Sequence, residues 1–142
     1  MTEEEKDRLR QAKEDVTQQL RHTNIDRYRL TEVDDRLDSY VREVAGNPDG
    51  HNLYEQLAVA HFFRMCDKYG INATEVQQFY DFYESLYFPG KKGQQRYELT
   101  PVQCFQFAGI FAFWQDGRRI VREAVLFVPR KFSKTTSTAS LA

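Results

Sequence analysis

Residues 53–69 read LYEQLAVAHFFRMCDKY, and they decide the fold class. Mostly apolar side chains recur there at intervals of three and four residues, which is the spacing of one face of an α-helix. That face comprises Leu53, Tyr54, Leu57, Ala58, His61, Phe62, Met65 and Tyr69. Lys68 lies in the last turn and Gly70 follows, and both are typical of a helix end. The pattern predicts a core helix within a mainly α fold.

Helical patterns also flank this stretch on both sides. A charged helix is expected over 2–22, because acids crowd its first turn and a narrow apolar stripe follows. A second helix is expected over 25–44, before the glycine, asparagine and proline residues of the turn at 46–50. An aromatic helix over 72–87 is then broken at 88–90 by proline and glycine. We expect its rings to pack on neighbouring helices rather than on nucleic-acid bases.

The last third of the chain carries the residues from which function can be argued. Thr100-Pro101-Val102-Gln103 is the pattern of a helix start, in which the Thr100 and Gln103 side chains each accept a hydrogen bond from the other's backbone N–H. This helix is expected over 100–115, with a turn at 116–119. The strand expected over 122–128 contains the run Ala124–Val128, which has no polar alternation and fits a strand covered on both faces.

A basic loop and two hydroxyl groups follow that strand, in the order of a phosphate-binding loop. In such a loop backbone N–H groups converge on the anion, the lysine reaches the outer phosphates, and the next hydroxyl binds magnesium. Lys134 and Thr135 fall in the register of G-x-x-x-x-G-K-[ST], whereas Val128 and Ser133 stand at its glycines. A left-handed conformation at Ser133 would cost about 1–2 kcal/mol. A solvated basic turn followed by a polar tail is the alternative interpretation.

Together the two motifs resemble the start of the ATPase domain in the large subunit of tailed-phage terminases. The family has a leucine and a proline ahead of a glutamine, as at Leu99, Pro101 and Gln103. About thirty residues later it has an arginine, usually a second basic residue, one variable residue and then Gly-Lys-Ser/Thr. The resemblance covers residues 97–142. It implies that a helical N-terminal region is followed by the first helix, strand and P-loop of a truncated α/β P-loop ATPase domain.

The resemblance also implies the site and its cofactors, ATP and Mg²⁺. Lys134 would contact the outer phosphates, Thr135 would bind the magnesium ion of the nucleotide, and Arg130 would be the loop arginine. Gln103 would lie near the adenine; a purely local capping role is the alternative, and the two roles are compatible. Because Ser133 replaces the family's glycine, we expect weak or absent ATP binding by this chain. The implied cofactor-binding set is Gln103, Arg130, Lys131, Ser133, Lys134, Thr135 and Thr136.

Terminase large subunits use ATP to drive DNA into a procapsid and cut it with a C-terminal nuclease. The resemblance therefore implies double-stranded DNA, the portal and the small terminase subunit as partners, in the cytoplasm of a bacterial host. The acids of ATP hydrolysis normally lie on a later strand of the sheet, and no such strand follows in this sequence. We expect an inactive N-terminal fragment. It would comprise a helical region at 1–90, a flexible basic linker at 91–98 and the start of the ATPase domain at 99–142.

Two other functions stay open: a helical protein-interaction module without nucleotide chemistry, and the start of another P-loop NTPase. The net charge of −1 argues against a nucleic-acid clamp along the whole chain, and no apolar run approaches the ~20 residues of a membrane span. Cys66 and Cys104 are expected to be reduced core thiols, and the histidines lack metal-ligand spacing. Without the rest of its sheet, the strand at 122–128 would be an exposed edge that self-associates, packs on the helices or frays.

Overall fold

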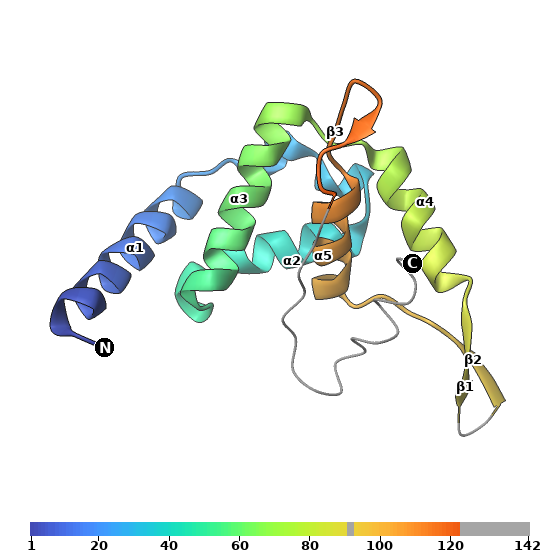
Figure 1. The fold of residues 1–142 in the computed structure, drawn as a ribbon, viewed down its shortest axis with the longest axis horizontal. Coiled ribbons are helices and arrows are strands. Elements are labelled where there is room, and N and C mark those ends of the chain that lie inside the picture. The colour runs from blue at the N-terminus through green and yellow to red at the C-terminus, as the bar shows by residue number, and fades with distance from the viewer. Residues whose placement is uncertain (91–92, 123–142) are drawn as a thin grey trace.

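The computed structural model describes residues 1–90 and 93–122, and this part of the chain is mainly helical (Figure 1). Two small antiparallel hairpins, β1–β2 and β3–β4, accompany the helices. The elements in chain order are α1 (Glu3–Arg21), η1 (Ile25–Tyr28), η2 (Leu30–Glu32), α2 (Asp35–Gly46), η3 (Pro48–Gly50), α3 (Leu53–Tyr69), α4 (Ala73–Glu84), β1 (Tyr87–Gly90), β2 (Gly93–Arg96), α5 (Pro101–Phe111), β3 (Trp114–Gln115) and β4 (Arg118–Arg119).

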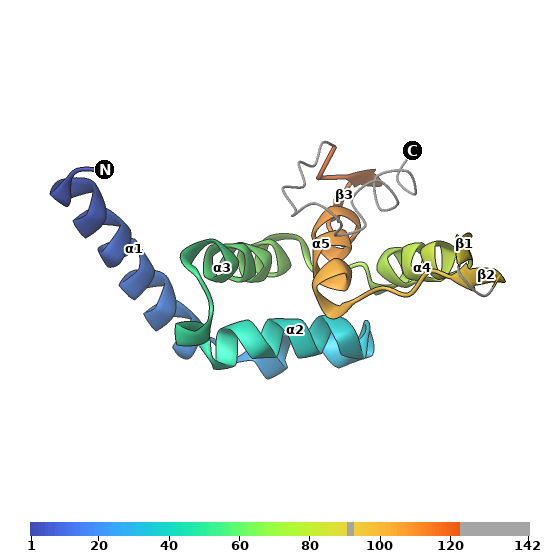
Figure 2. The ribbon, with the colours of Figure 1, turned by 90° about the horizontal axis from the view of Figure 1, so that it is seen from below.

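Helix α1 confirms the charged helix predicted at the N-terminus. The Thr2 hydroxyl accepts from the backbone N–H of Glu5 at 3.1 Å, and the Glu5 carboxylate accepts from the backbone N–H of Thr2 at 3.4 Å. This capping box satisfies two backbone donors that would otherwise lack partners. Only the C-terminal half of the helix is buried, through Val16, Thr17 and Leu20. The N-terminal half projects away from the other helices (Figure 2).

The single helix predicted over 25–44 is wrong in its first half. Two short 3₁₀ helices, η1 and η2, precede α2, and Arg29 between them has a left-handed φ of 52°. An α-helix cannot continue through that conformation. Asp34 then accepts a hydrogen bond from the backbone N–H of Arg36 at 2.8 Å and caps α2. Apolar spacing alone did not reveal this cap, which sets the true helix start.

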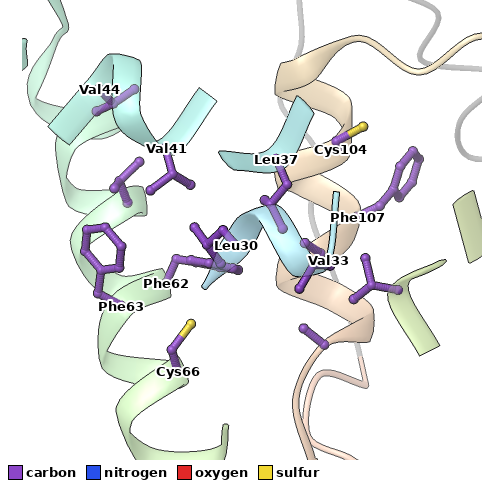
Figure 3. Close-up of a cluster of buried hydrophobic side chains, with 14 of the residues drawn as sticks. Leu30, Val33, Leu37, Val41, Val44, Phe62, Phe63, Cys66, Cys104 and Phe107 are labelled. Carbon is purple, nitrogen blue, oxygen red and sulfur yellow. The ribbon is translucent and has the colours of Figure 1, made fainter. Parts of the chain in front are cut away.

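Helix α3 has the predicted bounds, but only part of its predicted face, including Phe62, is buried. Tyr54 is 74% and Leu57 is 39% exposed, whereas Val59, Ala60 and Phe63 are buried. The helix is apolar on more than one side, so the spacing fitted two faces equally well. Packing against α1 and α2 selects the face with Val59 and Phe63. Figure 3 shows Phe63 in the same cluster as Val41 and Val44 of α2.

The aromatic helix, α4, buries its rings against α5, as predicted. Phe79 stacks on Phe111 with ring centroids 4.3 Å apart and lies 4.8 Å from Phe107. Tyr83 lies 5.6 Å from Phe107. Phe82 is the exception, because it is 51% exposed. The rings therefore join α4 to α5 and leave one large apolar side chain of α4 in solvent.

Strands replace two segments for which sequence predicted other structure. The chain around the expected flexible linker forms a hairpin in which Tyr87 pairs with Arg96. The helix expected up to Gln115 ends at Phe111, and a second hairpin follows whose turn residues, Asp116 and Gly117, both have positive φ. An Asp-Gly pair suits such a two-residue turn. The run Ala124–Val128 lies outside the described residues.

The described helices share one hydrophobic core. Leu37 of α2, Phe62 of α3 and Cys104 and Phe107 of α5 all belong to it (Figure 3). Helix α5, which the resemblance assigns to the ATPase domain, thus packs with the N-terminal helices. The proposed division at residues 91–98 stays a prediction.

A buried glutamine ties α1 to the start of α3. Gln56 has no exposed surface, its Oε1 accepts from the Thr17 hydroxyl at 2.6 Å, and its Nε2 donates to the carbonyls of Pro48 at 2.9 Å and His51 at 3.1 Å. Burial makes each of these polar groups costly to leave without a partner.

We expect Gln56→Leu to lower the free energy of unfolding by about 2–4 kcal/mol, because it removes the partner of the Thr17 hydroxyl and of the His51 carbonyl and one of the two donors to the Pro48 carbonyl. Urea unfolding followed by circular dichroism measures this. The matched control is Gln78→Leu, at an exposed position of α4, which should change stability by no more than about 0.5 kcal/mol. Equal effects of the two substitutions would contradict the role of Gln56.

Candidate functional site around Gln103

The described part of the predicted site is the start of α5. Thr100 is its N-cap and Pro101 its first residue, where a missing backbone N–H costs nothing. The Thr100 hydroxyl accepts from the backbone N–H of Gln103 at 3.3 Å, and Gln103 Oε1 accepts from the backbone N–H of Thr100 at 2.9 Å. The predicted capping box is therefore confirmed.

The cap also fixes how the Gln103 amide is oriented. A backbone N–H can only donate, so the side-chain atom facing Thr100 must be the carbonyl oxygen Oε1. That oxygen also accepts from the Thr100 hydroxyl at 3.2 Å. The amide nitrogen Nε2 has no hydrogen-bond partner among the described residues, although Gln103 as a whole is buried. Gln103 can therefore still donate from Nε2, whereas its Oε1 already accepts two hydrogen bonds.

An arginine of α2 holds the segment that leads into α5. The Arg36 guanidinium donates to both Asp34 oxygens at 3.1 and 3.0 Å and to both Glu84 oxygens at 2.9 and 3.0 Å. It also donates to the Leu99 carbonyl at 3.3 Å, while the Leu99 backbone N–H donates to Glu84 at the same distance. We call this set the Arg36 fork. It fixes the residue before the Thr100 cap against α2 and α4.

Charge in the fork favours the ionised forms of Asp34 and Arg36. Partial burial alone would raise the pKa of Asp34, but hydrogen bonds from the Arg36 guanidinium and from backbone N–H groups outweigh it and lower that pKa. Hydrogen bonds to Asp34 and Glu84 raise the pKa of Arg36 above its already high value. The Asp34–Arg36 pair therefore stays ionised at neutral pH and stabilises the native state there.

The tyrosine beneath the fork completes the attachment of α5. The ring of Tyr80 lies 5.6 Å from the Arg36 guanidinium carbon, and its hydroxyl donates to the Cys104 carbonyl. Burial raises the pKa of Tyr80 well above its ordinary value and that of the Cys104 thiol to about 12. Burial also raises the pKa of the Cys66 thiol, in α3, to about 12. Both cysteines are buried and free, as predicted for reduced core thiols.

Of the site residues predicted from the sequence, only Gln103 lies in the described part of the structure. Gln103 lies at the capped start of α5, whereas the remaining members of the predicted set lie outside the described residues. They are Arg130, Lys131, Ser133, Lys134, Thr135 and Thr136. Their roles stay predictions.

Sequence reasoning missed Arg36, Asp34 and Glu84. Asp34 and Arg36 are two residues apart at a helix start, where an acid before an arginine is a usable capping signal. Glu84 lies 48 positions from Arg36, and nothing in the local pattern connects them. The sequence thus contained a signal for the cap, which was missed, but none for the fork.

Metal binding finds no support within residues 1–90 and 93–122. No group of three or more ligand side chains occurs there that could hold an ion. His51 bonds locally, with its Nδ1 at 2.5 Å from a Glu55 carboxylate oxygen. Its Nε2 is buried and lacks a hydrogen-bond partner, although a Glu43 oxygen lies 3.5 Å away.

Comparison with known proteins gives no relative. No family model, no curated protein and no solved structure matches this chain. Across the described residues, none of the helices has the length and apolar character that crossing a membrane requires. The geometry around Gln103 and the sequence motifs must therefore carry the functional argument.

We expect Asp34→Asn to lower the free energy of unfolding by about 1–2 kcal/mol at neutral pH. Asparagine keeps the helix cap but removes the charge that faces Arg36. Because the folded-state pKa of Asp34 is lowered, its contribution is present above the unfolded value of about 3.9 and is lost as the pH falls towards the folded value. The difference between the two proteins should therefore shrink as the pH falls below about 4.

Urea unfolding at a series of pH values measures that difference. Asp35→Asn is the matched control, because Asp35 is an exposed neighbour that forms no ion pair with any described residue. A loss that is the same for both variants, or that does not change with pH, would contradict a charged contact at Asp34.

Proposed function

We propose that this chain is the N-terminal part of a tailed-phage terminase large subunit, the ATP-driven motor that packages DNA. The observation that carries the proposal is the order of two motifs, the Leu99–Gln103 helix start and the Arg130–Thr135 basic loop, about thirty residues apart. The capped start of α5 supports the first motif, because Gln103 keeps a free amide donor there.

In this proposal the nucleotide site is built from the loop and from Gln103. Lys134 contacts the outer phosphates of ATP, Thr135 binds the Mg²⁺ that accompanies them, and Arg130 adds positive charge beside the phosphates. The Nε2 group of Gln103 donates to a ring nitrogen of adenine, since its Oε1 is used by the cap. This chain alone does not hydrolyse ATP, because hydrolysis needs carboxylates of later strands.

The packing of α5 supports a mechanical role for the helical region. Its N-terminus is held by the Arg36 fork and its rings pack on those of α4. A displacement of α5 on nucleotide binding would therefore be passed to α2 and α4. In the proposed motor, such a displacement would act on the partners, which are double-stranded DNA, the portal and the small terminase subunit. The motor would work in the cytoplasm of the bacterial host.

A helical interaction module is the second candidate. The specific observation in its favour is the exposed apolar side of α3, where Tyr54 is 74% and Leu57 is 39% exposed. Contiguous exposed apolar surface marks many protein contact sites, and these two side chains lie one turn apart on the same side of α3. The experiment that follows separates the two candidates.

We expect Ser133→Gly to strengthen Mg²⁺–ATP binding about 5- to 30-fold, because it removes backbone strain of about 1–2 kcal/mol from the loop. Titration of the 142-residue chain with a fluorescent ATP analogue measures this. Lys134→Ala added to Ser133→Gly should abolish the binding. The matched control is Lys92→Ala, which removes a lysine outside the implied loop and should leave the affinity unchanged.

An unchanged affinity in Ser133→Gly would contradict the phosphate-loop assignment and would favour the interaction module. Equal losses from Lys134→Ala and Lys92→Ala would show that any binding is non-specific attraction to positive charge.

A further inference from the structure

The N-terminal half of α1 is a helix without a packing partner in the described part of the chain. Every residue from Glu3 to Asp15 is exposed, and Figure 2 shows this half standing clear of the other helices. It is about 20 Å long at 1.5 Å per residue. Isolated helices of this length are marginal in water, so contact with another surface would stabilise it.

The side of α1 that docks on the core continues into this free half. Leu9 is seven residues before the buried Val16, so both lie on one face of the helix, and Leu9 is 40% exposed. Glu5 and Lys13 lie one turn to either side of Leu9 on that face. Neither forms an ion pair with any described residue. The free half thus presents an acid, an apolar residue and a base in that order.

The outward side of α3 presents a complementary row. Tyr54, Leu57, His61 and Arg64 recur at intervals of three and four residues, and all four are exposed. Arg64 forms no ion pair within the described part of the chain. The row therefore runs from an aromatic ring through an apolar residue to basic groups.

We propose that the free half of α1 in one copy docks antiparallel on the outward side of α3 in a second copy. With Leu9 placed against Leu57, the equal rise of the two helices brings Glu5 level with His61 and within reach of Arg64. Lys13 then lies at Tyr54, where a cation can sit over the ring. The parallel orientation would instead set Lys13 beside the basic groups, so charge selects the antiparallel one.

A second copy is the occupant because α1 cannot reach the outward side of its own α3. The hydrogen bond from Thr17 to Gln56 anchors α1 on the buried side of that helix. One helix pair is a small interface, so the association is weak and depends on concentration. Two copies that each dock their free half on the other copy's α3 would form both contacts about one twofold axis.

Sedimentation equilibrium of the 142-residue chain tests this proposal. The average mass should rise from 16.8 kDa towards twice that value as the concentration approaches about 1 mM, the range of weak association. Leu9→Glu and Leu57→Lys should each weaken the association about tenfold or more. The double variant should recover most of it, because the new acid faces the new base.

Phe82→Glu is the matched control, because Phe82 is 51% exposed but lies on α4. It should leave the association unchanged, and circular dichroism should show that all variants keep their helix content. A mass of 16.8 kDa at every concentration would overturn the proposal. So would association that Leu9→Glu and Leu57→Lys leave intact, which would point to another surface such as the strand expected over 122–128.

Discussion

The contact on which the rest of the structure depends is the one between the Arg36 guanidinium, two carboxylates and the Leu99 carbonyl. Asp34 opens α2, Glu84 ends α4, and Leu99 precedes α5. The hairpin β1–β2 lies between Glu84 and Leu99, so the fork closes the base of the loop that contains it. A planar group with five donors suits this geometry, because lysine offers only a point charge.

The fork also explains how α5, which lies late in the sequence, joins a core built from the helices that precede it. Once Leu99 is fixed, α5 starts against α2, and its Phe107 and Phe111 meet Phe79 of α4. Apolar burial then supplies most of the stability, while the charged group decides where the helix begins. Under the proposed function, the first helix of the ATPase domain is thus built into the helical region rather than linked to it.

Local signals predicted those features whose causes are local. The bounds of α3 followed from the apolar spacing, Lys68 and Gly70, and the cap at Thr100 followed from four adjacent residues. The buried face of α3 did not, because only the neighbouring helices decide between two apolar sides. The break at Arg29 and the early end of α5 depend on turn conformations that apolar spacing does not show.

The same limit applies to the site. Gln103 was selected from its motif, and its capping box, which also orients the amide, was confirmed. The motif could not show that Nε2 keeps no hydrogen-bond partner among the described residues. Glu84 could not be connected to Arg36, since 48 residues separate them. Roles that rest on the resemblance, those of Lys134 and Thr135 above all, are set by a loop outside the described residues.

The two buried thiols have a practical consequence. Cys66 lies in α3 and Cys104 in α5, and burial holds the pKa of each at about 12, so almost no reactive thiolate forms while the helices stay packed. A thiol reagent will label each cysteine only when its own helix opens. Labelling rates read by peptide mass spectrometry therefore report the opening of α3 and of α5 separately, without any change to the sequence.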